Sequence, residues 1–246
     1  MPLTISPGPA AFAILLWFTA LPALSDATDG TMDIRRLAEG VYLHTSYGQI
    51  PGYGYYPSNG LVIVEDGSAY IIDTPWPVKD TPRLLAWIDA RGYTAVASVS
   101  THFHADRSSG IATLNEHGVH THASSLTNQL LRESGKPEAT HSFDAEGFWL
   151  LPDRIYVWHP GEGHSPDNVV VWLPRNKMIA GGCLVRSLDT QSTGNTTDAN
   201  LTQWPASIGR VEARFPDAQR VVPGHGEPGG RELLAHTRRI LEASNE

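Results

Sequence analysis

The sequence contains little cysteine and comparatively little positive charge. Its 246 residues include one cysteine, Cys183, so an intrachain disulfide is excluded and this side chain matters as a thiol or as a metal ligand. Its 18 basic residues are outnumbered by 26 acidic ones, which gives a formal net charge of -8. Proteins that bind a nucleic-acid backbone show the opposite balance, so we expect no nucleic-acid partner.

Hydrophobic runs long enough to cross a membrane are also lacking. The apolar run from Ala10 to Ala20 is too short to span a bilayer. The small residues Ala23 and Ser25 stand just before the first charged residue, Asp26. This pattern predicts a signal segment over residues 1–25, cleaved after Ser25, and a periplasmic protein without a membrane anchor. No Lys or Arg precedes the run, and the alternative is a buried N-terminal helix.

The remaining sequence predicts one globular domain over residues 26–246. Hydrophobic residues make up 41% of the chain and charged residues 18%, enough apolar material for a substantial core. Strands and helices are interspersed without a Pro/Gly/Ser-rich linker, so we expect sheets covered by helices on their outer faces. The predicted strands are a hairpin over 58–73, then 95–100, 155–158, 168–173, 178–180 and 220–222. The predicted helices are one that begins near Thr81 and stops at Gly92, a short one that ends near Gly118, and two more over 202–215 and 231–241.

Six residues of metal-binding type follow predicted strands or lie in glycine-rich turns. His102, His104 and Asp106 occupy alternate positions directly after a strand, and alternate residues of an extended chain point to the same side. His164, Cys183 and His225 each have a glycine as the preceding residue. These residues are expected to converge on one site.

The chain also contains a second His-x-His pair for comparison. His120 and His122 are followed by Ser124 instead of a carboxylate, and no glycine-rich loop surrounds them. We interpret this pair as structural, on a strand that leads into a helix start at 124–125. The same interpretation applies to the isolated histidines, which are His44, His117, His141, His159 and His236.

The six residues lie in four motifs that resemble those of a known family. His102-Phe103-His104-Ala105-Asp106-Arg107, Gly163-His164-Ser165-Pro166-Asp167-Asn168, Gly181-Gly182-Cys183 and Pro223-Gly224-His225-Gly226 are similar to the metal motifs of the class B β-lactamases, subclass B1. The resemblance extends from about Tyr55 to His225 and includes Ile72-Asp73-Thr74-Pro75-Trp76. Arg107 after Asp106, and a cysteine in the later ligand position, distinguish the chain from glyoxalase II-like and lactonase-like relatives.

The resemblance implies an αββα sandwich, with two mixed sheets and helices on both outer faces, and a groove that holds two zinc ions. It assigns His102, His104 and His164 to the first zinc, and Asp106, Cys183 and His225 to the second. Imidazole, thiolate and carboxylate are ligands that zinc accepts, and three protein ligands leave a position open for water. The implied activity is hydrolysis of penicillins, cephalosporins and carbapenems by a metal-bound hydroxide, conferring antibiotic resistance.

The resemblance also implies roles for residues that bind no metal. Asn195 would bind the lactam carbonyl or oxyanion, and Asp106 would orient the hydroxide as well as bind metal. Arg186 stands where the family often has a lysine that pairs with the substrate carboxylate; the alternative is a solvated arginine. Trp76 would form the site floor.

Three further features of the sequence are assigned with alternatives. A hairpin over 47–56 would cover the substrate; the alternative is an aromatic patch that stabilises a long loop. Asp73 and Arg107 would hold the metal ligands by hydrogen bonds, or are surface or strand-end residues. The expected partner is a small β-lactam, bound to a monomer.

Two other functions remain as alternatives. One is a zinc hydrolase of the same fold that acts on a thioester, lactone or phosphoester, which Arg107 and Cys183 disfavour. The other is a zinc-binding protein without enzymatic activity, which would be expected to have lost a ligand. Fold alone does not decide between them, because function resides in the site.

Overall fold

The structure, a computed structural model, describes Met1 and residues 30–144 and 147–243. The predicted signal segment, residues 1–25, lies outside the described residues except for Met1. Within the described part, none of the helices is long and apolar enough to cross a membrane.

The N-terminal half builds a seven-stranded sheet whose strands follow sequence order. The first three pairings are antiparallel, and the pairings from β4 to β7 are parallel. The expected hairpin is confirmed: Glu65 pairs with Ser68 across Asp66 and Gly67, and both turn residues have the positive φ that a two-residue hairpin requires. The strands are β1 (Asp33–Ala38), β2 (Val41–Ile50), β3 (Gly54–Glu65), β4 (Ser68–Ile72), β5 (Thr94–Val99), β6 (His120–Ser124) and β7 (His141–Phe143).

The C-terminal half builds a five-stranded sheet in the order β12-β11-β10-β9-β8. Only the pairing between β11 and β12 is parallel within this sheet. A parallel pairing needs a crossover, and the chain between these two strands includes a helix, α5. The strands are β8 (Phe148–Leu151), β9 (Ile155–Trp158), β10 (Val170–Leu173), β11 (Met178–Gly182) and β12 (Arg220–Pro223).

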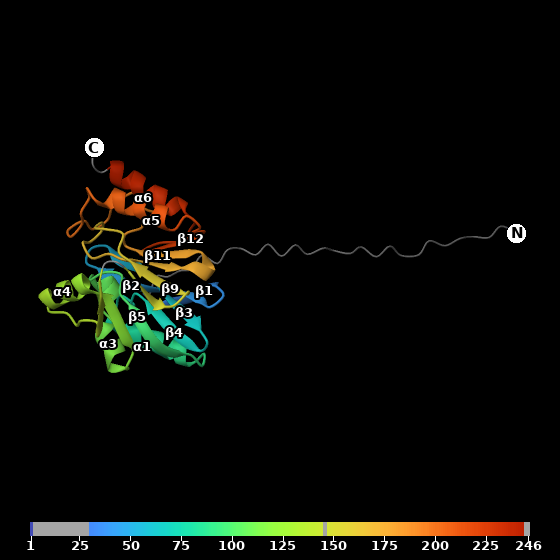
Figure 1. Ribbon diagram of the computed structural model, residues 1–246. Coiled ribbons are helices and arrows are strands. Elements are labelled where there is room, and N and C mark those ends of the chain that lie inside the picture. Colours follow the sequence, from blue (N-terminus) through green and yellow to red (C-terminus); the bar gives the residue numbers. More distant parts are fainter. Residues whose placement is uncertain (2–29, 145–146, 244–246) are drawn as a thin grey trace.

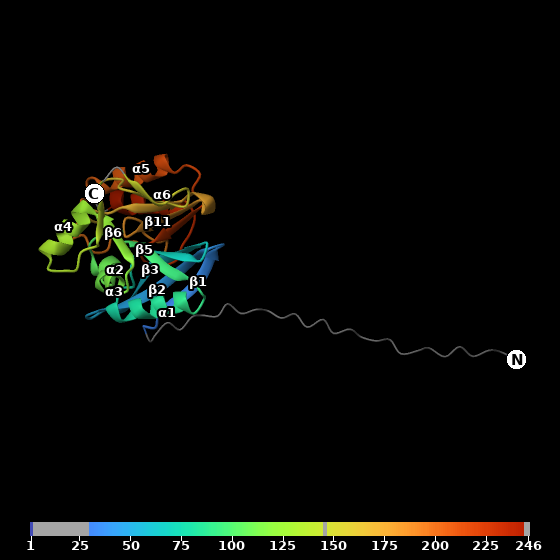
Figure 2. The ribbon, with the colours of Figure 1, turned by 60° about the horizontal axis from the view of Figure 1, so that its bottom comes forward.

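Helices cover the outer face of each sheet, so the molecule has four layers (Figure 1). Helices α1 (Thr81–Asp89) and α3 (Ile111–Glu116) lie against the seven-stranded sheet, and α5 (Trp204–Arg214) and α6 (Glu232–Ala243) lie against the five-stranded sheet. Figure 2 shows the same layers after a rotation. The expected αββα sandwich is therefore confirmed. The remaining helices are η1 (Val78–Asp80), α2 (Ala105–Ser108), α4 (Ser125–Glu133) and η2 (Pro174–Asn176).

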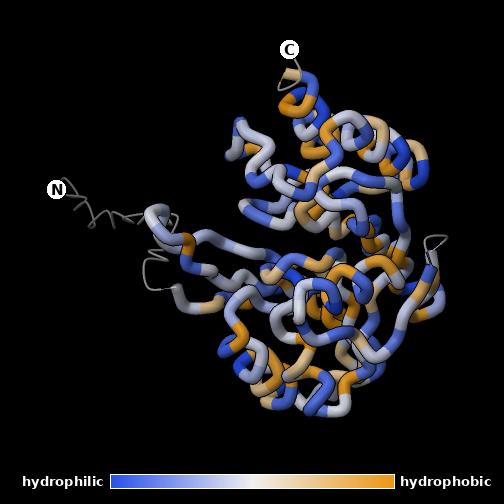
Figure 3. The backbone as a smooth tube through the Cα atoms, turned by 90° about the vertical axis from the view of Figure 1, so that its left-hand side faces the viewer, coloured by the Kyte–Doolittle hydropathy of each residue, from blue (hydrophilic) through white to orange (hydrophobic). Residues whose placement is uncertain are grey.

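The apolar core consists of three layers that match this architecture. One lies between the two sheets and includes Leu61 and Val171, both fully buried. A second packs Trp204 and Ile208 of α5 against the five-stranded sheet, and a third packs Leu84 of α1 against the other. The hydrophobic stretches of the tube in Figure 3 gather along these packed segments. Burial of both sheet faces fixes the strand ends from which the site is built.

One local expectation is wrong. The segment from His102 to Asp106 is not an extended chain: residues 101–104 bend, and Asp106 lies in the first turn of α2. From this position the Asp106 carboxylate contacts Cys183 and His225. As a result the motif divides its ligands between two adjoining clusters.

Candidate metal centre

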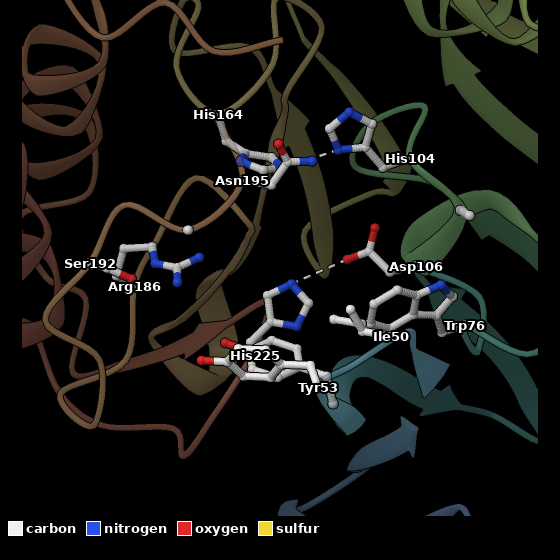
Figure 4. Close-up of a pocket in the computed structure, with 13 residues that line it drawn as sticks. Ile50, Tyr53, Trp76, His104, Asp106, His164, Arg186, Ser192, Asn195 and His225 are labelled. Atoms are coloured by element: carbon white, nitrogen blue, oxygen red, sulfur yellow. Dashed lines mark hydrogen bonds and ion pairs between the residues drawn. The ribbon is translucent and has the colours of Figure 1, made fainter. Parts of the chain in front are cut away.

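Four of the six predicted ligands line a cleft of about 530 Å³, and the other two, His102 and Cys183, are buried beside them. It is lined from one side by the β2–β3 hairpin and from the other by the segment after β11, as Figure 4 shows. The ligands themselves come from four segments, each at the end of a strand or in the turn before one. The loop after β5 carries His102, His104 and Asp106; His164 precedes β10, Cys183 follows β11 and His225 follows β12.

The first cluster contains three imidazoles. His104 Nδ1 lies 3.1 Å from His102 Nε2 and 3.1 Å from His164 Nε2. His102 and His164 are buried, and His104 is half-buried at the cleft. Donors bound to one tetrahedral zinc at 2.0–2.1 Å would be about 3.3 Å apart, so the three nitrogens are spaced as zinc ligands are.

The second cluster contains a thiol, a carboxylate and an imidazole. Cys183 Sγ lies 3.3 Å from Asp106 Oδ2 and 3.2 Å from His225 Nε2, and these last two atoms are 3.3 Å apart. His102 is close to this cluster too, because its ring, Asp106 and Cys183 offer donor atoms within 4.8 Å of one another. Gly224 makes the approach of the strands possible, since an added Cβ would lie 2.8 Å from Cys183 Sγ. The two clusters therefore adjoin through His102.

The electrostatic environment suits metal ligands. Burial lowers the pKa of His164 to about 3, with His104 adding to the effect, and burial together with His164 holds the pKa of His102 well below its usual value. Both rings are thus neutral and present lone pairs, as metal binding requires. Burial alone would raise the pKa of Asp106, but Arg107 and His225 hold it well below its usual range. This carboxylate is therefore ionised.

Cys183 completes the evidence that a cation belongs here. Burial raises the pKa of its thiol, and Arg107 offsets only part of this effect. A coordinated divalent ion would deprotonate the thiol outright and would also balance the Asp106 charge. The donor types and the spacing of both clusters fit zinc.

Arg107 and Asp73 form a buried network beneath the second cluster. Arg107 is fully buried and lies 2.9 Å from Asp106 Oδ2 through its Nη2 atom. Asp73 accepts hydrogen bonds from the Thr101 amide at 2.7 Å and hydroxyl at 3.0 Å, and lies 3.3 Å from Arg107. The network thus contacts Asp106 directly and holds the residue that precedes His102. Arg107 also donates to the carbonyl oxygens of Asn59 and Gly224.

Several contacts to the ligands were not anticipated from the sequence. Asp198 Oδ2 lies 2.8 Å from His104 Nε2, and the Pro57 carbonyl oxygen lies 2.6 Å from His225 Nδ1. Each partner accepts the proton of the nitrogen that faces away from the metal cluster, which fixes the tautomer and the ring orientation. Asp167 accepts from the Phe103 amide at 2.9 Å, between the two histidines. No local motif marks Asp198, because 94 residues separate it from its partner.

Aromatic residues line one wall of the cleft. The Tyr56 and His225 rings have centroids 5.0 Å apart, and Trp76 lies 6.3 Å from His225 on centroids. Trp76 packs against β2 at Gly48, where an added Cβ would lie 2.2 Å from the indole ring. Tyr53, at the exposed end of the hairpin, also lines the cleft (Figure 4). The segment over 47–56 thus forms a hairpin beside the metal clusters, with turn residues 51–53.

Arg186 and Asn195 line the opposite side. Arg186 is 6% exposed, its Nε atom has no partner among the described residues, and its guanidinium points into the cleft in Figure 4. Asn195 is exposed and lines the same cleft as His164, and its side-chain oxygen accepts from the Thr197 amide. The loop between them is joined to α6, where His236 Nε2 donates to the Thr190 carbonyl at 2.8 Å. His120 and His122, by contrast, lie on β6 and do not line the cleft.

This fold and site define a class: hydrolases of the αββα type whose metal clusters adjoin at one edge of the sheets. No protein-family model matches the sequence. Individual relatives do. A metallo-β-lactamase type 2 of Pseudomonas aeruginosa is 39% identical over 92% of this chain and 91% of its own length. One of Bacteroides fragilis is 36% identical over 85% of each.

Solved structures give the same result. The crystal structure of VMB-1 at pH 5.5 matches with a TM-score of 0.87 and 40% identity over 88% of this chain and 99% of that one. DIM-1 metallo-β-lactamase exposed to ceftazidime matches with a TM-score of 0.85 and 44% identity over 87% and 97%. The chain belongs to the metallo-β-lactamase type 2 family and is a zinc-dependent hydrolase of the β-lactam ring. The predicted family and the predicted pair of zinc-binding clusters are confirmed.

Proposed function

We propose that this enzyme binds two zinc ions and hydrolyses penicillins, cephalosporins and carbapenems, and thereby confers antibiotic resistance. The observation that carries this proposal is the convergence of six donors into two adjoining clusters. His102, His104 and His164 would hold one ion, and Asp106, Cys183 and His225 the other. A related structure, FIM-1 from Pseudomonas aeruginosa, is described in a mono-zinc form, so zinc content is the first quantity to measure.

Zinc, when bound, supplies a Lewis acid that polarises the lactam carbonyl and lowers the pKa of a water to about 7. The side chains of the site would position the attacking water and the metal ligands. Asp106 lines the cleft and uses one carboxylate oxygen, Oδ2, for Arg107, Cys183 and His225, which leaves a second oxygen outside these contacts. That second oxygen is placed to accept a hydrogen bond from the attacking water and orient it toward the carbonyl. Arg107 and Asp73 would keep Asp106 and the His102 loop in this geometry.

Arg186 and Asn195 would bind the substrate. The buried guanidinium with an unpartnered Nε is an anion-binding group directed into the cleft, which supports Arg186 as the partner of the substrate carboxylate. An arginine offers two parallel N–H donors where a lysine offers a point charge. The Asn195 amide lies across the cleft from Asp106 and would donate to the lactam carbonyl as negative charge develops on its oxygen.

The aromatic wall would take the apolar part of the substrate. Trp76, Tyr56 and Tyr53 together form an apolar surface beside His225. The cleft is open toward solvent between this wall and the Arg186 loop, and its volume of about 530 Å³ is in the range of small-molecule sites. This openness supports a broad substrate range that includes carbapenems.

We also propose an exported monomer. The apolar run, the small residues before Asp26 and the absence of a second apolar run of that kind support removal of residues 1–25 and a single periplasmic domain over 26–246. The partners of such a protein would be small β-lactams. N-terminal sequencing of the secreted protein, together with its mass in solution, tests both points.

The substrate and metal proposals are tested by one set of assays on the purified protein. Zinc per chain is measured by elemental analysis after dialysis, and turnover is measured on a penicillin, a cephalosporin and a carbapenem. After dialysis against zinc-free buffer we expect two zinc ions per chain, and we expect turnover of all three substrates. One zinc at full activity would overturn the two-ion assignment, and a carbapenem left intact while the others are hydrolysed would restrict the substrate range.

A further inference from the structure

Three histidines outside the cleft are brought together at the edge of the seven-stranded sheet. His120 and His122 lie two positions apart on β6 and therefore share one face of the strand. Strand β7 adds His141 directly opposite His122 in the parallel register. The rings of His122 and His141 are stacked with centroids 4.8 Å apart, and the His120 ring lies 5.2 Å from that of His141. The fold thus gathers three imidazoles that the sequence separates.

Hydrogen bonds fix the proton of His122 on the nitrogen nearer the backbone. Its Nδ1 atom lies 3.1 Å from the Ser98 carbonyl oxygen and 2.9 Å from the His120 carbonyl oxygen. Carbonyl oxygens only accept, so Nδ1 is the donor and Nε2 carries the lone pair. Burial and the neighbouring imidazoles lower the pKa of His122, which keeps Nε2 unprotonated at neutral pH.

A chain of hydroxyl groups fixes His141 in the same way. The Thr121 hydroxyl donates to Asn115 Oδ1 at 2.6 Å, so the Thr140 hydroxyl is the donor in its contacts with Thr121. Thr140 Oγ1 therefore accepts from His141 Nδ1 at 2.9 Å, and the lone pair of His141 is also on Nε2. A ligand imidazole whose other nitrogen donates to a backbone or side-chain oxygen is the usual arrangement in metal sites.

We propose that His120, His122 and His141 form a peripheral site for a divalent late transition-metal ion, separate from the catalytic cleft. Imidazole nitrogen suits zinc, copper and nickel. His122 is the fixed ligand, because it is half-buried between His141 and Phe148, whose ring stacks on it at 5.7 Å. These three side chains neither line the catalytic cleft nor belong to the buried network of Arg107 and Asp73.

Binding at this edge requires a small change of side-chain conformation. Within the described part of the chain, groups of three donors already within 4.8 Å of one another occur at the cleft clusters alone. The rings of His120 and His141 are exposed, and exposed side chains change rotamer in picoseconds to nanoseconds. The proposal therefore requires the rings of His120 and His141 to turn toward His122 Nε2 while His141 Nδ1 keeps its contact with Thr140.

Zinc is used as the probe, because the cleft of this enzyme takes zinc and no other metal is then introduced there. Wild-type protein, His120→Gln/His141→Gln and the control His117→Gln are dialysed against micromolar free zinc, and bound zinc is measured. His117 is an exposed histidine at the end of α3, three residues before β6, and does not belong to the group. We expect wild type and His117→Gln to hold one zinc more than the double variant. The variant Thr140→Val, which removes the acceptor for His141 Nδ1, should weaken this zinc roughly tenfold.

Side-chain NMR of the histidine Cε1–H groups provides the second measurement on the wild-type protein. During a zinc titration beyond saturation of the cleft, the signals of His122 and His141 should shift while that of His117 stays. β-Lactam turnover should be equal in all variants. Equal zinc in wild type and the double variant, or a His117 signal that shifts as much as the others, would overturn the proposal.

Discussion

Acid destabilisation through His44 is a prediction whose size follows from the structure. His44 is fully buried on β2, and its Nε2 lies 3.1 Å from the Asp73 carbonyl oxygen. The carbonyl accepts, so the ring proton is on Nε2, while Nδ1 is buried and has no partner in the described part of the chain. Burial and the Arg107 charge lower the pKa of His44 from 6.5 to about 4. Protonation would add a proton at Nδ1, where no acceptor among the described residues faces it, and would leave the buried ring positively charged.

The sign and magnitude follow from proton linkage. Because the folded pKa lies below the unfolded one, the stabilisation is complete above pH 6.5 and is lost as the pH falls from 6.5 to about 4. At pH 5 the loss from this group is roughly 2 kcal/mol, and over the whole shift it is about 3 kcal/mol. The variant His44→Gln can still donate to the Asp73 carbonyl but does not titrate.

The assay is urea unfolding of wild type and His44→Gln at pH 8 and pH 5, both metal-free with chelator. The zinc ligands are the same in both proteins, so their titration cancels in the difference. We expect the free energy of unfolding of the variant, relative to wild type, to rise by roughly 2 kcal/mol between pH 8 and pH 5. Parallel pH profiles for the two proteins would refute the assigned protonation of His44.

Three substitutions at the site give further predictions. Cys183→Ser should cost one zinc per chain and reduce turnover while the three-histidine cluster stays loaded; metal analysis showing two zinc ions at full activity would contradict the ligand assignment. Arg186→Ala should raise KM for carboxylate-bearing substrates roughly tenfold or more, and more than it lowers kcat, in steady-state assays; an unchanged KM would place the carboxylate elsewhere. Asp198→Ala should weaken zinc at the three-histidine cluster 10- to 100-fold, on the order typical for lost partners of metal ligands, in competition with a chromophoric chelator; wild-type affinity would show that Asp198 does not support His104.

The ligand set could be predicted because each ligand belongs to a short sequence motif. Each ligand lies within a few residues of a glycine, a turn or a strand end, and such local patterns survive in the sequence. The αββα layering followed from the same resemblance together with the alternation of strands and helices. The backbone path from His102 to Asp106 was not predictable from residue alternation, because the tight entry into α2 replaces the extended chain.

Contacts between distant segments could not be predicted. Asp198 supports His104 across 94 residues, and His141 meets His122 because two strands pair in one particular register. The strands β7 and β8 are three and four residues long, too short for a clear hydrophobic pattern. Register and loop docking are set by the packing of the two sheets, which local sequence does not encode.

The most direct test of the account is carbapenem hydrolysis by the purified protein before and after removal of its metal. The account predicts turnover that a chelator abolishes and that added zinc restores, with recovery complete at the second zinc per chain. Turnover that persists in metal-free protein, or a zinc-loaded protein that leaves every β-lactam intact, would contradict it.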